Sequence, residues 1–287
     1  MNRAERRAAS GKKRTGVCKL SQTHGTFVEA HLIPKSLTRP DQNGAPLYQL
    51  GFKTRPVRRW SSWYDPYLVT QDGENILTAL DTWAVSEFRK HKLIWTSWDT
   101  TEDLGTLHTP IQGSPWGMRR IDGINPTKLR LFFLSLLWCA AATDLPEFSA
   151  VVLPPNDLER LRCMLVSGNP DPIAFYPSQL TQLSTIGRIH NQSPTAGLKK
   201  IPNLESKGIF IQLPIFRFYF DGLIAHVHRH ATDDGTTAEI GNMIVGAESS
   251  LLVSTQTYED SFQSGNVEAI LSGNEKPTFP PGCLTSA

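Results

Sequence analysis

The amino-acid sequence predicts an α+β protein, in which a small unit of two strands and a helix precedes a larger C-terminal domain of mixed α/β structure. Three observations support this class: short β-branched runs and one periodic helix before residue 100, a mostly apolar helix after residue 125, and long strand-like runs after residue 207. The chain has 287 residues, of which 39% are hydrophobic and 20% charged, which is enough apolar material for one or two cores. This composition excludes a disordered chain, a coiled coil and a collagen-like repeat.

The N-terminal unit is expected over residues 16–105, after a basic, flexible arm at 1–15. Short apolar and β-branched runs predict one strand at 25–33 and another at 57–60. A helix is expected over 73–92, because apolar residues recur there at three- and four-residue steps and define one buried face. The members of that face are Ile76, Leu77, Leu80, Trp83, Ala84 and Phe88.

The C-terminal domain is expected over residues 120–272, followed by a loose tail at 273–287. Residues 97–123 are rich in Gly, Pro and Asp, which predicts a linker in front of this domain. Asn125 followed by Pro126 is typical of a helix N-terminus, so a mostly buried helix is expected from this point.

A β-hairpin is expected late in this domain. Strand-like runs at 208–220 and 223–230 flank Asp221 and Gly222, which form a favoured two-residue hairpin turn. Pro214 cannot donate a hydrogen bond to a neighbouring strand, so the first of these strands is expected at a sheet edge or at a bulge.

Several features favour a cytoplasmic protein with no membrane partner. The longest apolar run, at 131–142, has 12 residues, whereas a membrane-spanning helix needs roughly 20. The basic N-terminus is followed by no apolar segment of the kind that directs secretion. The cysteines lie far apart in the sequence, which indicates reduced thiols in a chain without an export signal: Cys18, Cys139, Cys163 and Cys283.

The charge distribution favours a polyanionic partner such as DNA. Residues 1–60 hold 13 Lys and Arg against three acidic residues, whereas the rest of the chain is net acidic. Within this region a cluster of basic residues lies inside the expected fold, interleaved with the aromatic residues Phe52 and Trp60. Three members of the cluster are candidates to hold DNA phosphates: Arg55, Arg58 and Arg59. The alternatives are a solvated basic tail and ordinary surface ion pairs.

One constellation carries the residue types of a metal-dependent hydrolase. His31 ends the first strand, and Glu74 and Asp81 lie seven residues apart on the helix, so that both carboxylates project from nearly the same face. An imidazole opposite carboxylates suits one divalent metal ion, such as Mg, Mn or Zn. In phosphodiester hydrolysis such an ion stabilises charge on the phosphate while the histidine deprotonates water. Each residue also has a purely structural interpretation, as a core or surface histidine and as acids on a solvated helix face.

The segment His31-Leu32-Ile33-Pro34-Lys35 resembles the H-I-I-P-K signature of HNH endonucleases, and residues 65–88 are similar to the second half of the same motif. The resemblance implies a ββα fold around one metal ion and hydrolysis of DNA. It also implies a bacterial or phage-associated protein that acts in phage defence or genetic conflict. The resemblance implies that His31 is a general base and that Glu74 and Asp81 are metal ligands. It also implies that Asn75 is an orienting amide and that Lys35 contacts DNA.

The sequence departs from the family pattern where many relatives hold a structural zinc ion. The first of two Cys-x-x-Cys pairs is Cys18-x-x-Ser21 here, and the second falls on Thr70 and Gly73. One thiolate of four cannot make a tetrahedral zinc site, so no structural zinc is expected.

These departures keep other functions open. A helix histidine of the family is also missing, so Asp81 or His91 would have to replace it. One alternative is an inactive HNH-like subunit that binds nucleic acid or serves in assembly, and another is a module that recruits a protein partner or a second copy through a sheet edge. Three further histidines share one strand face and are expected to form a polar, solvated surface, with weak metal or phosphate binding as the alternative: His226, His228 and His230.

Overall fold

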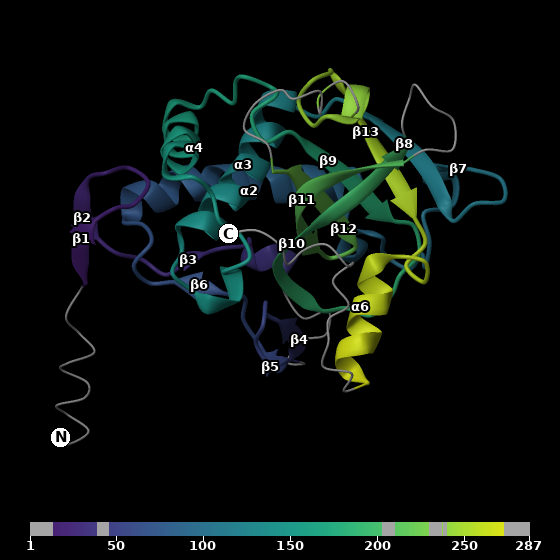
Figure 1. Ribbon diagram of the computed structural model, residues 1–287, viewed down its shortest axis with the longest axis horizontal. Helices are drawn as coiled ribbons and strands as arrows, with labels where there is room; N and C mark the ends of the chain where they lie inside the picture. The colour runs from purple at the N-terminus through teal and green to yellow at the C-terminus, as the bar shows by residue number, and fades with distance from the viewer. Residues whose placement is uncertain (1–13, 39–45, 203–209, 230–236, 238–239, 273–287) are drawn as a thin grey trace.

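The computed structural model describes residues 14–38, 46–202, 210–229, 237 and 240–272. Among them, nine strands form one mixed sheet in the order β5–β4–β10–β11–β12–β9–β13–β8–β7 (Figure 1). Two short hairpin-like sheets, β1–β2 and β3–β6, stand outside it. Helices and strands together form the α+β class that the sequence predicts.

The elements have the following bounds. The helices are α2 (Gln71–Lys90), α3 (Pro126–Ala142), α4 (Pro155–Ser167) and α6 (Phe262–Leu271). The strands of the large sheet are β4 (Leu47–Leu50), β5 (Val57–Arg59), β7 (Thr109–Pro110), β8 (Trp116–Asp122), β9 (Ser178–Leu183), β10 (Asn191–Pro202), β11 (Phe210–Phe220), β12 (Leu223–His228) and β13 (Ser250–Gln256). The remaining strands are β1 (Thr15–Val17), β2 (His24–Thr26), β3 (Ala30–His31) and β6 (Tyr64–Asp65).

The central hairpin shows how the sheet separates two layers. β11 and β12 pair around the predicted turn, where Asp221 and Gly222 both have positive φ. Successive side chains of a strand point to opposite faces. Phe220 stacks against α3 in the main core, whereas the Arg217 guanidinium lies on the other face, 4.0 Å from the ring centroid of Phe262 in α6.

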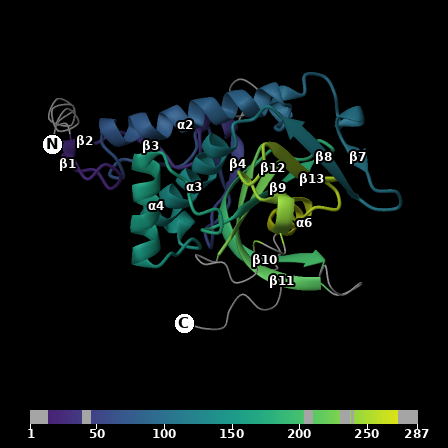
Figure 2. The same cartoon turned by 90° about the horizontal axis from the view of Figure 1, so that it is seen from above.

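One continuous apolar core joins the N-terminal and C-terminal parts of the chain. α3 is buried on nearly all sides, as predicted, and Asn125 caps it by accepting a hydrogen bond of 2.9 Å from the Lys128 backbone. α2 packs on α3 through Phe88, whose ring centroid lies 5.4 Å from that of Phe132. In Figure 2, α2 runs along one side of the molecule and β10 and β11 lie on the opposite side.

The C-terminal end of α2 is tied to the large sheet by a buried arginine. Arg119 of β8 donates to the backbone carbonyls of His91 and Lys92, the latter at 3.2 Å, and to the Gln182 side chain of β9 at 2.9 Å. A cation at this end satisfies carbonyls that the helix leaves open and complements the helix dipole. The helix that carries Glu74 and Asp81 is therefore held firmly at its far end.

Some sequence-based expectations are wrong in detail. Residues 97–123 are more than a linker, because β8 pairs along its whole length with β13. The strand at 25–33 is interrupted and forms β2 and β3. Pro214 does not place β11 at an edge, since β11 lies between β10 and β12; Pro214 pairs with Leu198 of β10, just past the last residue pair with β12.

Three predictions concern the ends of the chain and the membrane. The predicted arm at 1–15 lies almost wholly, and the predicted tail at 273–287 wholly, outside the described residues. No helix in the described part of the chain has the length and apolar character that a membrane span requires.

Candidate functional site

The candidate site is built on a strand–strand–helix unit. β3 pairs antiparallel with β6, which places His31 opposite Tyr64, and α2 follows. The buried carboxylate of Asp65 accepts hydrogen bonds from the Tyr67 backbone at 2.8 Å and from the Thr143 hydroxyl at 2.7 Å. These two bonds fix the turn between β6 and α2, so His31 ends a strand whose partner leads directly into the helix.

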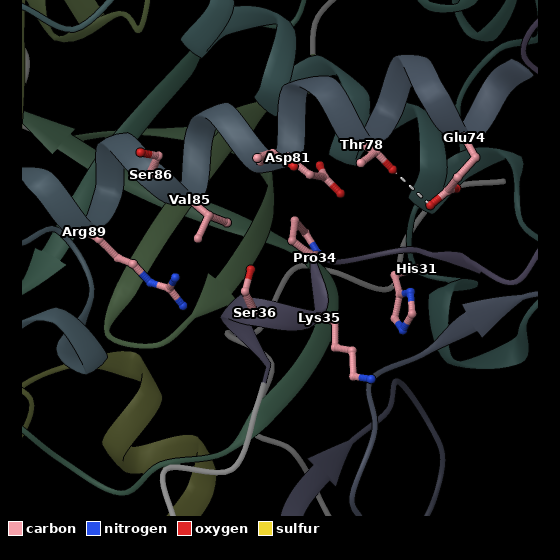
Figure 3. A pocket seen from close by; sticks show the side chains of 11 residues that line it. His31, Pro34, Lys35, Ser36, Glu74, Thr78, Asp81, Val85, Ser86 and Arg89 are labelled. Carbon is pink, nitrogen blue, oxygen red and sulfur yellow. Dashed lines mark hydrogen bonds between the residues drawn. The ribbon is translucent and has the colours of Figure 1, made fainter. Parts of the chain in front are cut away.

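A pocket of about 520 Å³ lies between α2 and the segment that follows β3. It brings together four predicted site residues, His31, Lys35, Glu74 and Asp81. Figure 3 shows Glu74 and Asp81 on one side of α2, facing the segment that carries His31 and Lys35. The other lining residues are Pro34, Ser36, Thr78, Thr82, Val85, Ser86 and Arg89.

The two carboxyl groups of the pocket both resist ionisation. Burial, together with the negative charge of Glu74, raises the pKa of Asp81 to about 8. Burial also raises the pKa of Glu74, although a 3.2 Å hydrogen bond from the Thr78 hydroxyl partly offsets this. Near neutral pH, Asp81 is therefore largely protonated in the metal-free protein, and the pocket holds fewer negative charges than its sequence suggests.

The imidazole of His31 is neutral near pH 7. Burial and the nearby positive charge of Lys35 lower its pKa, and the carboxylate of Glu29 offsets only part of this shift. A neutral imidazole has one ring nitrogen free to accept a proton. The Tyr64 ring, with its centroid 6.5 Å from that of His31, flanks it on the β6 side.

The pocket fits a divalent cation in the chemistry of its donors. Imidazole nitrogen and carboxylate oxygen suit Mg, Mn or Zn. A cation would offset the burial and the repulsion from Glu74 that together raise the pKa of Asp81. Among the described residues, no three or more His, Cys, Asp and Glu side chains lie close enough together to hold an ion. A cation here would therefore need water or substrate oxygens in addition to the protein ligands.

The remaining predicted site residues lie outside this pocket. Asn75 is exposed on α2, where its Oδ1 accepts a hydrogen bond of 2.9 Å from Gln71. The Arg58 guanidinium lies 4.8 Å from the ring centroid of Tyr48 and donates to its hydroxyl. Three arginines are exposed on the β4–β5 hairpin, at one edge of the large sheet: Arg55, Arg58 and Arg59.

Sequence analysis missed the polar residues of α2 that extend the pocket. Thr78, Ser86 and Arg89 line it together with Glu74 and Asp81. These positions follow one another at steps of three, four or five residues, which places them along one side of a helix. This spacing was available in the sequence, and Arg89 adds a positive charge at the end of the pocket remote from Glu74.

The four positions compared above with two Cys-x-x-Cys pairs lie close together in the structure, but only one of them carries a thiol: Cys18, Ser21, Thr70 and Gly73. The Ser21 backbone N–H donates to Cys18 Sγ at 3.3 Å, and a Cβ atom on Gly73 would lie 2.6 Å from the same sulfur. Burial raises the pKa of Cys18, but hydrogen bonds from Ser21 and Thr70 together outweigh it and lower the pKa. Close packing around one buried thiol thus joins the β1–β2 turn to the start of α2.

The histidines of β12 do not form the solvated surface that the sequence predicts. His226 and His228 are both buried, and His230 lies outside the described residues. His226 lies between Lys199 Nζ, 3.2 Å from its Nδ1, and Arg217 Nε, 3.4 Å from its Nε2. The prediction failed because neighbouring strands and long basic side chains cover this face of the sheet.

Comparison with known proteins adds no further information about the site. The chain matches no protein-family model, and searches of curated proteins and of solved structures find no significant match. We therefore infer function from the strand–strand–helix unit and from its pocket, which His31, Glu74 and Asp81 line together.

Proposed function

We propose that the protein is an HNH-like, metal-dependent endonuclease that hydrolyses phosphodiester bonds in DNA. The observation that carries the proposal is the pocket between β3 and α2, which joins His31 to Glu74 and Asp81. His31 is more than 40 residues from Glu74 and Asp81 in the sequence, and the fold brings all three to one cavity. The elements that carry them follow the strand–strand–helix order of the HNH motif. The exposed arginines of the β4–β5 hairpin supply positive charge for the DNA backbone.

His31 acts as the general base in the proposed reaction. Its lowered pKa keeps the imidazole neutral, so one ring nitrogen accepts the proton of the attacking water. Lys35 lines the same pocket and is exposed, which suits a contact with the phosphate oxygens. A divalent cation, when bound, supplies charge stabilisation for the phosphate and for the leaving oxygen.

Glu74 and Asp81 would hold this cation. Asp81 must lose its proton to act as a ligand, because only the carboxylate form coordinates a metal ion well. The raised pKa of Asp81 therefore means that cation binding releases a proton near neutral pH. Cation binding should accordingly be weaker at pH 6 than at pH 8.

The second candidate function is an inactive subunit that binds nucleic acid. Two observations favour it: the Asp81 carboxyl is largely protonated near neutral pH, and Asn75 is exposed outside the pocket. Such a protein would keep the arginines of the β4–β5 hairpin and bind DNA with a steep dependence on salt. A protein-interaction module would show no DNA affinity.

Plasmid nicking by the purified full chain in Mg, Mn or Zn tests the proposal. His31→Ala should lower the cleavage rate by about 10²- to 10⁴-fold, the range for loss of a general base. His24→Ala is the matched control, since His24 is exposed on β2 and does not line the pocket. Cleavage by the wild type and by His24→Ala, but not by His31→Ala, would support the proposal.

Two other results would reject it. Folded protein that binds DNA but cleaves with none of the three metals would favour the inactive subunit. Cleavage that persists in His31→Ala would place the activity at another site or in a contaminant.

A further inference from the structure

A second group of polar side chains lies on the face of the large sheet opposite α3. Thr195 of β10 pairs with Arg217 of β11, which pairs in turn with His226 of β12, so the three side chains share one face. Lys199 lies four residues after Thr195 on β10, so its side chain is on the same face, and its amine reaches His226. The group therefore draws on three adjacent strands in the middle of the sheet.

Hydrogen bonding fixes the proton positions in this group. A guanidinium can only donate, so the contact between Arg217 Nε and His226 Nε2 requires this ring nitrogen to accept. Burial and the charges of Lys199 and Arg217 lower the pKa of His226, which keeps the ring neutral with its proton on Nδ1. The Lys199 amine, 3.2 Å from Nδ1, can then accept this proton's hydrogen bond only in its uncharged form.

The electrostatics of Lys199 agree with this arrangement. Burial, together with the positive charge of Arg217, lowers the pKa of Lys199 to about 7. The described groups that act on this amine are His226 and Arg217, and neither of them is an anion. Lys199 nevertheless keeps part of its surface exposed to solvent. An anion that arrived here would favour the ammonium form of Lys199, because an opposite charge nearby stabilises the charged form of an amine.

The surroundings contain a hydrogen-bond donor for such an anion, and the described side chains leave space beside it. Gly197 lies between Thr195 and Lys199 on the same face, and among the described residues a Cβ atom there would meet only the Arg217 guanidinium, at 3.8 Å. Within the described part of the chain, the buried hydroxyl of Thr195 has no hydrogen-bond partner. A buried hydroxyl without a partner costs free energy, which a ligand oxygen at this position would recover.

We propose that Lys199, Arg217 and Thr195 form a binding site for a phosphate group, on the opposite side of the sheet from the candidate nuclease pocket. A phosphate oxygen would accept hydrogen bonds from the Lys199 ammonium, the Arg217 guanidinium and the Thr195 hydroxyl. Phosphate suits this set because its several oxygens can bind planar guanidinium and ammonium donors together. The ligand is either inorganic phosphate or the phosphate of a small ester such as a mononucleotide.

Lys199→Met is the variant that tests this site. It removes the amine and keeps an unbranched apolar side chain of similar length. Lys200→Met is the matched control, because Lys200 is the next residue of β10, is exposed and points to the opposite face. Calorimetric titration and thermal unfolding would be run with inorganic phosphate and with a nucleoside 5′-monophosphate, at constant ionic strength.

The proposal predicts that phosphate at about 100 times its Kd raises the Tm of the wild type and of Lys200→Met by about 5 °C. Lys199→Met should bind about 10- to 100-fold more weakly, as expected for the loss of a charged hydrogen bond. Its Tm without phosphate should fall by less than about 5 °C, since the variant removes a buried amine next to a cation but also leaves the His226 Nδ1–H without its acceptor. Tighter binding of the mononucleotide than of inorganic phosphate would identify an ester as the ligand, and equal binding would identify phosphate itself.

Two results would overturn the proposal. One is the absence of any phosphate-dependent shift in the folded wild-type protein. The other is an equal shift in Lys199→Met and Lys200→Met, which would mean that phosphate acts elsewhere or through general salt effects. Neither result bears on the nuclease pocket, because plasmid cleavage is measured independently.

Discussion

Replacing Asp81 with Asn should make the protein more stable at alkaline pH. Asp81 has a pKa of about 8 in the folded state against a usual value of 3.8, a difference of about four units. The folded protein thus keeps a proton between about pH 4 and pH 8 that the unfolded chain has released, so wild-type stability falls as pH rises through this window. Four units correspond to about 6 kcal/mol at the upper limit. Because the pocket is open to water, we expect about 2–3 kcal/mol.

Unfolding by guanidinium chloride at pH 5, 7 and 9, with EDTA present, measures this effect. Asp81→Asn should come within about 1 kcal/mol of the wild type at pH 5 and exceed it by about 2–3 kcal/mol at pH 9. Asp72→Asn is the control, because Asp72 is exposed in the first turn of the same helix and should lose about 0.3–1 kcal/mol at every one of these pH values. If the wild type and Asp81→Asn lost the same amount of stability from pH 5 to pH 9, the raised pKa of Asp81 would be refuted as the cause of the pH dependence.

Two further predictions concern stability. Gly73→Ala should cost about 1–2 kcal/mol, because the new Cβ would lie 2.6 Å from Cys18 Sγ. Gly265→Ala in α6 should instead gain about 0.5–1 kcal/mol, because its Cβ would meet no described atom within 4 Å. Equal effects of the two substitutions in chemical unfolding would contradict the close packing around Cys18. Arg130→Met should cost about 3 kcal/mol, because it removes hydrogen bonds from a buried guanidinium to three backbone carbonyls. Arg120→Met, which breaks an exposed ion pair with Asp122 and an exposed hydrogen bond to Ser250, should cost about 1 kcal/mol. A similar loss in both variants would argue against the structural role of Arg130.

Sequence patterns predicted the elements whose buried positions are apolar. The helix at 71–90 and the helix at 126–142 both follow runs of apolar residues with helical spacing, and the hairpin at 210–228 contains a recognisable turn. β8 was missed for a clear physical reason. Its buried positions are Gly117, Arg119 and Ile121, whereas Trp116 and Met118 are exposed, so the usual alternation is reversed.

The central strand β9 was missed for a related reason. All six of its residues are buried, yet Gln179, Thr181 and Gln182 are polar and gave no apolar signal. The polar face of the sheet, with Lys199 and Arg217, follows from strand pairing across long sequence distances, which local patterns do not contain. For the same reason the sequence could propose His31, Glu74 and Asp81 as partners but could not give the shape of their pocket.

The pairing of β4 with β10 has a consequence for synthesis of the chain. Gln49 and Leu50 align with Asn191 and Gln192, so the neighbour of the β4–β5 hairpin is made about 140 residues later. At a ribosomal rate of about 5–20 residues per second, the hairpin waits roughly 7–28 s for this strand. During that interval the nascent chain exposes an unpaired strand edge, which is where chaperones and premature aggregation compete. The exposed arginines of the β4–β5 hairpin are therefore expected to reach their final position long after the residues that line the candidate pocket have been synthesised.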